Sequence, residues 1–242
     1  MEAKQNSITR FMQQQDVQFI IPVYQRNYDW RIEQCQQLLF DIFKAGSDNK
    51  IISHFIGSIV YIQMNPLVSS PVLTIIDGQQ RLTSITLIVI ALYNRCLESG
   101  NIKLANEVKK RYIINEFMSD EEKLKLKPIK KDDKALQYIL NQPDDKFPDF
   151  SRLVENYSYF YNNIQANNVE VIHQGLQKLL FIEIGLDKGR DDPQKIFQSL
   201  NSTGLDLSQA DLIRNYVLMD LPQKQQLKIY ENYWIKIELH TT

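Results

Sequence analysis

The chain is poor in the residues that mark several classes of protein. Only two of its 242 residues are cysteines, Cys35 and Cys96. Both fall within apolar helical patterns, so we expect reduced core thiols and no disulfide framework. The histidines, His54, His173 and His240, are widely spaced and have no C-x-x-C pair beside them. A zinc site or a complete histidine-metal nuclease centre is therefore not expected.

Other familiar signatures are missing too. Neither G-x-x-x-x-G-K-[ST] nor G-x-G-x-x-G occurs, so the chain is not a P-loop NTPase. The formal net charge is -1, so nucleic-acid binding would depend on a local patch. The longest strongly apolar run, Ile85 to Leu92, is far too short to cross a membrane, and the N-terminus has no apolar signal core. We expect a cytoplasmic protein with no membrane partner.

What remains is the composition of a globular protein, with 43% hydrophobic and 24% charged residues. The β-rich runs Phe55–Gln63 and Val72–Ile76 predict a hairpin or neighbouring strands, and shorter strands are predicted at Val17–Pro22 and Leu180–Leu186. A helix from about Gln79 to Leu97 is apolar on nearly every side, which predicts a buried, central helix. We predict an α/β (α+β) fold, with a small mixed β-sheet core and many added helices.

Apolar residues at helical spacing predict the other helices. Asp29 is the expected N-cap of one helix, and Ser208 that of another, with Asp211 three residues on. The run Lys103–Lys134 holds ten Lys/Arg and seven Asp/Glu, which favours a solvated helical face over a DNA-facing one. Further helices are predicted at Ser7–Gln14, Leu153–Tyr161, Val169–Leu179, Pro193–Leu200 and Pro222–Glu238.

We divide the chain into four parts. Residues 1–100 form the α/β core, residues 101–180 a helical insertion and residues 181–221 a return to the core. Residues 222–242 form a C-terminal helix that begins a further helical or nuclease region.

The stretch Ile75–Thr83 reads as a strand, a glycine turn and the start of a helix. A helix N-terminus offers free backbone N–H groups and a positive dipole end, which suit an anion. A cation in the first turn, Arg81, opposes that dipole unless a negative group compensates, and a phosphate gripped by the guanidinium would do so. Gln79, Gln80 and Thr83 add neutral donors. The structural alternative is that Asp77 caps the helix, Gly78 makes the turn and Arg81 pairs with Asp77.

Two further stretches hold candidate residues. Ile21–Trp30 packs two tyrosines, a tryptophan, Gln25 and Arg26 beside a strand end, which suits base stacking and phosphate contact. Its alternative is a loop pinned to the core by its aromatic rings. Ile196–Asn215 reads as a turn and a capped helix, in which Gly204, Ser208 and Asp211 are structural and Asn201, Arg214 and Asn215 are candidates to face a ligand.

These stretches resemble one known family, the N-terminal domain of GmrSD-type modification-dependent restriction endonucleases, within the ParB/sulfiredoxin-like superfamily. The family shows I-P-x-Y-Q-R-x-Y-x-W, matched by Ile21–Trp30, and F-[IL]-G-x-[IL], matched by Phe55–Ile59. Its D-G-Q-Q-R-L-T signature is matched by Asp77–Thr83, and F-x-x-L-N-x-x-G-x-x-L-x-x-x-D-L-[IL]-[KR]-N by Phe197–Asn215. The four matches occur in the family's order and spacing. Residues from about Gly100 to Leu180 carry the least resemblance.

The resemblance implies a ParB-like core that binds and hydrolyses an NTP in an anti-phage restriction system, with an HNH-type nuclease domain in cis or in trans. Asp77 would position a Mg²⁺ ion or cap the helix, and no other metal ligand is assigned. Binding of DNA is expected through the full-length protein, and a homo-oligomer is compatible with the family. The residues given a catalytic role are Asp77, Gln79, Gln80 and Arg81. The residues given a nucleotide-binding role are Gly78, Thr83, Tyr24, Gln25, Arg26, Asn201 and Arg214.

Three functions compete. The first is a regulatory NTPase in which Gln79 or Gln80 orients the attacking water. The second is a non-catalytic sensor of DNA modification, in which Tyr24, Tyr28 and Trp30 stack on a base. The third, ranked last because the sequence shows no metal-ligand cluster, is a ParB-like nuclease. We do not expect this chain alone to cleave DNA.

Overall fold

The computed structural model describes residues 1–64, 71–119, 123–141, 146–187, 189–201 and 208–237. Within them a mixed six-stranded sheet has the order β1-β6-β3-β4-β2-β5. The strands are β1 (Glu2–Ser7), β2 (Gln18–Ile20), β3 (His54–Met64), β4 (Val72–Asp77), β5 (Leu126–Lys127) and β6 (Leu179–Leu186). The pairs β1–β6 and β3–β4 are antiparallel, whereas β3–β6, β2–β4 and β2–β5 are parallel. The α/β fold predicted from the sequence is therefore confirmed, including the neighbouring strands β3 and β4.

Helices surround this sheet. The α-helices are α1 (Ile8–Met12), α2 (Ile32–Ser47), α3 (Gln79–Glu98), α4 (Ile102–Val108), α5 (Lys130–Asn141), α6 (Arg152–Asn163), α7 (Val169–Gln177), α8 (Pro193–Asn201), α9 (Gln209–Leu218) and α10 (Gln223–Ile229). Two π-helical turns are η1 (Lys109–Ile113) and η2 (Tyr230–Trp234).

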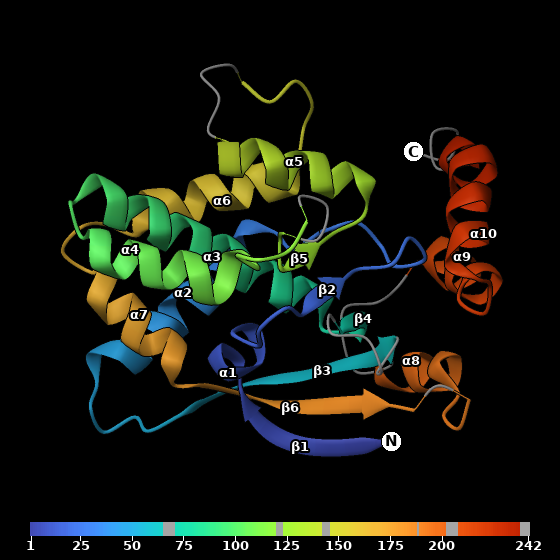
Figure 1. Cartoon of the computed structure of the whole chain (residues 1–242), viewed down its shortest axis with the longest axis horizontal. Coiled ribbons are helices and arrows are strands. Elements are labelled where there is room, and N and C mark those ends of the chain that lie inside the picture. Colours follow the sequence, from blue (N-terminus) through green and yellow to red (C-terminus); the bar gives the residue numbers. More distant parts are fainter. Residues whose placement is uncertain (65–70, 120–122, 142–145, 188, 202–207, 238–242) are drawn as a thin grey trace.

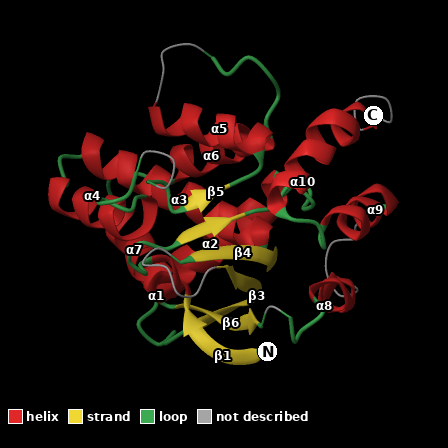
Figure 2. Ribbon diagram, turned by 45° about the vertical axis from the view of Figure 1, so that its right-hand side comes forward, coloured by secondary structure: helices red, strands yellow, loops and turns green. Residues whose placement is uncertain are grey.

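The helices form one large layer and a smaller group. Helices α2 to α7 lie together above the sheet in Figure 1, and α3 runs through the middle of that layer, packed against α4 and α6. The apolar side chains of α3 are buried nearly all the way round, as predicted. Helix α8 lies on the other side of the sheet and contacts β4 (Figure 2). The first turn of α3 is thus held between the sheet and the helical layer.

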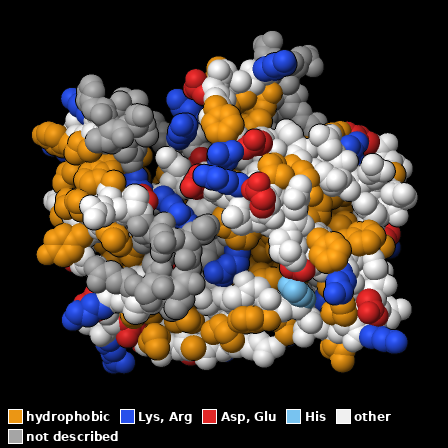
Figure 3. Space-filling view, turned by 180° about the vertical axis from the view of Figure 1, so that it is seen from behind, with side chains coloured by type: hydrophobic (Ala, Val, Ile, Leu, Met, Phe, Trp, Pro, Cys, Tyr) orange, Lys and Arg blue, Asp and Glu red, His pale blue; other side chains and the backbone are white. Residues whose placement is uncertain are grey.

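Helices α9 and α10 project to one side of the sheet in Figure 1. Leu218 at the end of α9 is buried, as are Tyr230 and Trp234 in η2, which continues α10. Their outward residues include Ile213 and Tyr216, which are exposed, and hydrophobic side chains gather at this edge of the molecule in Figure 3. The predicted helix Pro222–Glu238 corresponds to α10 followed by η2.

Two local predictions are wrong, and one strand was missed. The N-cap of α2 is Arg31, not Asp29, because a capping box joins Arg31 to Gln34 at the third helical position. Strand β1 was not predicted, because its residues are polar and mostly exposed and it is held as an edge strand by pairing with β6. The charged run Lys103–Lys134 is not one helical face, since it passes from α4 through η1 and β5 into α5.

Two glycines set the contact between α2 and α7. A Cβ atom on Gly46 would lie 1.9 Å from the carbonyl oxygen of Val171, and one on Gly175 would lie 1.9 Å from that of Ile42. Only glycine lets the two backbones approach this closely. The contact fixes α7, and through it the start of β6, against the helical layer.

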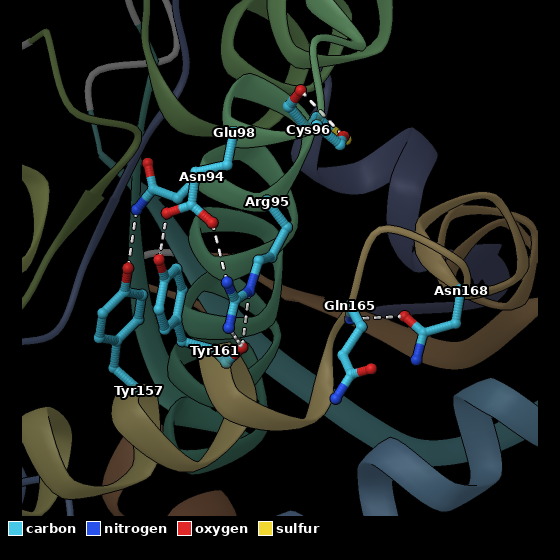
Figure 4. A network of polar contacts seen from close by, with 9 residues as sticks. Asn94, Arg95, Cys96, Glu98, Tyr157, Tyr161, Gln165 and Asn168 are labelled. Carbon is cyan, nitrogen blue, oxygen red and sulfur yellow. Dashed lines mark hydrogen bonds and ion pairs between the residues drawn. The ribbon is translucent and has the colours of Figure 1, made fainter.

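A polar network joins the C-terminal end of α3 to α6 (Figure 4). Asn94 donates to the hydroxyl of Tyr157 at 2.7 Å, and the guanidinium of Arg95 donates twice to the carbonyl of Tyr161. The same guanidinium lies 3.7 Å from the centre of the Tyr161 ring and pairs with Glu98 at 2.8 Å. These contacts anchor the far end of the helix whose first turn carries the candidate site.

Both cysteines are buried and free, as predicted. In the described part of the chain, no helix combines the length and the apolar character that a membrane crossing requires.

Candidate functional site

The turn between β4 and α3 is built around one glycine. Gly78 has a φ of 86°, in the left-handed region, and a Cβ atom there would lie 2.7 Å from the carbonyl oxygen of Ser58. Both the conformation and the close approach to β3 require glycine. Among the described residues no side chain caps the N-terminus of α3, and its first turn holds no acidic residue. The first N–H groups of a 20-residue helix therefore have no side-chain acceptor, which suits an anion.

Arg81 lies in this first turn and is half-buried. Its guanidinium donates from Nη1 to the carbonyl oxygen of Ser58. It also occupies the space beside Gly57, because a Cβ atom on Gly57 would lie 2.8 Å from Nη1 and 3.0 Å from Cζ. Burial lowers the pKa of Arg81, and the charge of Asp77 acts in the opposite direction. Among the described ion pairs, none joins Arg81 to Asp77 within 4.0 Å, so the closed pair of the structural alternative is not formed.

Asp77 ends β4 beside this guanidinium. Burial raises the pKa of its carboxyl, while the charge of Arg81, the backbone N–H of Gly78 and the charge of Arg26 act to lower it. Two cationic side chains and one carboxylate therefore influence one another at the same helix start. A phosphate here would meet more positive than negative charge.

The two glutamines of the D-G-Q-Q-R segment have different surroundings. The Gln80 carbonyl oxygen accepts from the backbone N–H groups of Asp29 at 2.9 Å and Trp30 at 3.2 Å, and its amide donates to the carbonyl of Asn27 at 3.2 Å. All of its hydrogen bonds therefore go to the loop that follows β2. The side chain of Gln79 is 7% exposed and has no hydrogen-bond partner among the described residues. Of the two amides, only that of Gln79 is free to meet a ligand.

Hydrogen bonds from its side chains fix the loop from Ile21 to Trp30 to the surrounding elements. Gln25 donates to the carbonyl of Ile76 at 2.7 Å, which fixes the loop to the end of β4. The hydroxyl of Tyr28 lies 2.6 Å from Ser84 Oγ and accepts from the Asn156 amide at 3.1 Å. Tyr24 is 4% exposed and Tyr28 6%, so neither ring can stack on a base. For these two rings the structure agrees with the alternative in which aromatic rings hold the loop to the core. The side chain of Arg26 remains half-exposed.

The third stretch joins the same assembly. Arg214, 3% exposed, donates from Nε to the carbonyl of Tyr24 at 3.3 Å and from Nη2 to Asp211 at 2.5 Å. Ser208 and Asp211 form the predicted capping box of α9. Arg214 therefore holds α9 to the loop that precedes Gln25.

Some of the predicted site residues lie away from the β4–α3 turn, and others lie outside the described residues. Thr83 is 2% exposed inside the helical layer. Asn201 ends α8, but its side chain and Gly204 lie outside the described residues. Asn215 is 2% exposed, and neither end of its amide has a hydrogen-bond partner in the described part of the chain.

The sequence analysis gave no site role to Gly57 and Ser58, although they lie in the matched Phe55–Ile59 segment; the carbonyl of Ser58 accepts from Arg81, and Gly57 leaves room for it. A glycine inside a strand indicates a bulge or a close backbone approach. Gly57 is such a glycine in the sequence. The structure has the expected irregularity there, because the register of β3 against β6 shifts between Phe55 and Ser58. No group of three His, Cys, Asp or Glu side chains within the described residues is arranged to hold a metal ion.

Comparison with known proteins gives one family. Residues 8–218 match the family model described as GmrSD restriction endonuclease, N-terminal domain. No curated protein matches the chain.

Proposed function

Because this chain belongs to the family of GmrSD restriction endonuclease N-terminal domains, and so takes part in a restriction system of that type, we propose that it is the nucleotide-binding and nucleotide-hydrolysing module of that system. The observation that carries the proposal is the pairing of an uncapped helix start with the seated guanidinium of Arg81. Phosphate oxygens would accept from the backbone N–H groups of Gln79, Gln80 and Arg81. The guanidinium would add bidentate hydrogen bonds from the side.

The residues at the turn divide the work of hydrolysis. Water attacks the terminal phosphorus, the bond to the bridging oxygen breaks, and the products are a nucleoside diphosphate and inorganic phosphate. The Gln79 amide orients that water, because it is the uncommitted amide at the helix start. Gln80 positions the site by holding Asn27, Asp29 and Trp30 in place. Arg26 approaches the terminal phosphate from the loop.

Asp77 suits a magnesium ion. Mg²⁺ takes one or two protein carboxylates together with phosphate oxygens and waters, so a single aspartate at the turn is sufficient once a triphosphate is present. Such an ion would neutralise charge that develops on the phosphate oxygens. Burial raises the pKa of Asp77, and a bound cation would act in the opposite direction by favouring the carboxylate.

Within the restriction system, nucleotide occupancy would bias a nuclease partner of the HNH type, in the same chain or in another, between active and inactive states. The sensor of modified bases is the weaker candidate, because Tyr24 and Tyr28 are buried.

The test is hydrolysis of the four common NTPs with Mg²⁺ by wild type and Arg81→Ala. We expect turnover to fall on the order of a hundredfold in Arg81→Ala, as for loss of one charged donor at a transition state. Arg10→Ala is the control, since Arg10 is an exposed arginine on α1. Equal rates for wild type and Arg81→Ala would defeat the mechanism.

A further inference from the structure

Helix α9 turns polar side chains toward the protein and apolar side chains toward the solvent. Arg214 and Asn215 point inward and are buried, together with Leu218. The outward side chains are Leu212, Ile213, Tyr216 and Val217. A surface helix normally does the opposite, with charged residues outward and an apolar stripe inward. The inward arginine is explained by its hydrogen bond to the carbonyl of Tyr24, whereas the outward apolar residues serve no contact within the described chain.

The outward side of α9 is a sizeable apolar surface. The exposed fractions are 40% for Leu212, 55% for Ile213, 69% for Tyr216 and 45% for Val217. Together these side chains leave on the order of 400 Å² of apolar surface on one helix face, as large as the patches that mark interaction sites on monomeric proteins. The helix stands at the edge of the molecule in Figure 1, and its exposed side chains from Gln209 to Val217 are all uncharged. We call this surface, with Gln209 and Asp220 at its two ends, the α9 face.

The order of residues on the α9 face is symmetric about a midpoint between Arg214 and Asn215. Three pairs lie at equal distances on either side of it: Ile213 and Tyr216, Leu212 and Val217, Gln209 and Asp220. If two copies of the helix lay antiparallel about a twofold axis through this midpoint, each member of a pair would meet the other member on the opposite copy. Such an isologous contact requires a surface that is complementary to itself. The α9 face meets this requirement, with apolar pairs at its centre and an amide opposite a carboxylate at each end.

We propose that the α9 face binds a second copy of this chain through the same face, in an antiparallel, twofold contact. Two such faces would bury about 800 Å² of apolar surface and, because somewhat more than half of an interface is apolar, about 1,400 Å² in all, which is the standard size of a specific interface. A formal net charge of -1 on each copy opposes the association only weakly. We expect a dissociation constant in the micromolar range. The proposal does not depend on nucleotide hydrolysis.

The contact would lie one helix away from the loop that reaches the candidate site. Arg214, on the opposite side of α9, donates to the carbonyl of Tyr24. The next residue, Gln25, is fixed to the end of β4 by its hydrogen bond to Ile76. A second copy would therefore hold α9 in the position from which Arg214 supports this loop.

Sedimentation equilibrium of the whole 242-residue chain, without nucleotide, tests the proposal. Wild type should show a monomer–dimer equilibrium that depends on concentration. Tyr216→Asp places a charge in the centre of the contact and should weaken the association by at least about tenfold. Phe117→Asp is the matched control, because Phe117 is 90% exposed between η1 and β5 and lies outside the α9 face. Circular dichroism spectra show whether both variants fold.

Cysteine substitutions determine the orientation of the two helices. Gln209→Cys and Asp220→Cys are purified separately, mixed and oxidised with diamide, which takes up the two hydrogens as a disulfide forms. The mixture should cross-link, because position 209 of one copy meets position 220 of the other. Neither variant should cross-link alone, since equivalent positions would lie about 16 Å apart along the helix axis, too far for a disulfide. The native cysteines are both buried and free.

A wild type that stays monomeric up to several hundred micromolar overturns the proposal and leaves the α9 face to a different protein. Tyr216→Asp that associates as strongly as wild type also overturns it. If that variant does not fold, the cross-linking decides: a mixture that gives no disulfide, or single variants that cross-link as well as the mixture, excludes the antiparallel contact. Since none of these measurements involves nucleotide, their outcome is separate from that of the hydrolysis assay.

Discussion

The guanidinium of Arg81 occupies the space that a side chain on Gly57 would need. The two residues lie on neighbouring elements, the first turn of α3 and the bulged start of β3, and are 24 positions apart in the sequence. Gly57 has no Cβ, which leaves room for the Arg81 guanidinium. The carbonyl of the adjacent Ser58 accepts a hydrogen bond from that guanidinium. The glycine of the strand is therefore part of the site.

Gly57→Ala should displace Arg81 and reduce nucleotide hydrolysis. The new Cβ would lie 2.8 Å from Nη1, and the φ of +100° adds backbone strain. Gly100→Ala supplies the control, because Gly100 also has a positive φ, +75°, but has no neighbour within 4 Å. Both variants should lose about 1–2 kcal/mol of unfolding free energy to strain, measured by urea denaturation, and only Gly57→Ala should lose hydrolysis as well. Equal hydrolysis by the two variants would show that the seat of Arg81 is irrelevant to activity.

The two adjacent glutamines should respond differently to substitution. Gln80→Ala removes the acceptor of Asp29 and Trp30 and the donor to Asn27, so we expect a loss of about 1–3 kcal/mol of unfolding free energy. Gln79→Ala breaks no hydrogen bond to a described residue and should leave stability nearly unchanged while lowering turnover. Thermal denaturation and a phosphate-release assay on both variants separate the two roles. If Gln79→Ala proves the less stable of the two, the assignment is reversed.

The sequence was sufficient to predict the elements with strong periodicity. The buried helix α3, the neighbouring strands β3 and β4 and the capping box of α9 all depend on short patterns in which local and tertiary preferences agree. Strand β1 could not be predicted, because its polar residues become a strand only by pairing with β6, more than 170 positions away.

The candidate site, too, could be predicted from the sequence only in part. The sequence indicates the helix start and its arginine, since glycine and polar residues interrupt an apolar pattern there. It does not distinguish Gln79 from Gln80, because that difference depends on a loop about 50 positions earlier. Nor does it show that Tyr24 and Tyr28 face inward, since the composition of that loop suits a binding surface and a buried anchor equally well.

Asp132 should make stability depend on pH. Burial raises the pKa of its carboxyl from 3.8 to about 6, although the carboxylate accepts the backbone N–H of Tyr28 at 2.7 Å. The folded state therefore binds this proton more tightly than the unfolded state, so the contribution of Asp132 to unfolding free energy is greatest at low pH and is lost as pH rises through about 6. Asp132→Asn keeps an acceptor without the charge. It should be more stable than wild type by about 1–3 kcal/mol at pH 7.5 and by less at pH 5, in urea titrations at both values. An advantage that does not shrink at low pH would exclude this titration.

The contact between α2 and α7 should tolerate no side chain at its centre. Gly46→Ala or Gly175→Ala places a methyl group 1.9 Å from a carbonyl oxygen, so the two helices must separate. We expect a loss of at least about 3 kcal/mol of unfolding free energy, beyond the usual cost of overpacking, because backbone and not side chain must move. Chemical denaturation measures the loss. A change below about 1 kcal/mol would show that the helices adjust easily.

Asn215 and Asn94 give opposite predictions for the same substitution. Both are buried, but Asn94 donates to Tyr157 at 2.7 Å, whereas neither end of the Asn215 amide has a partner among the residues that the structure describes. Replacing a buried amide that makes no hydrogen bond removes a desolvation cost of about 1–3 kcal/mol, while replacing one that does leaves its partner unsatisfied. Asn215→Leu should therefore raise the unfolding free energy and Asn94→Leu should lower it, in parallel denaturant titrations of the ligand-free protein. Leucine has the same number of side-chain heavy atoms as asparagine but bulkier methyl groups, so the cost of overpacking falls on both variants and the comparison between them isolates the hydrogen bond. A loss of stability in Asn215→Leu larger than that in Asn94→Leu would mean that a bound water satisfies the Asn215 amide.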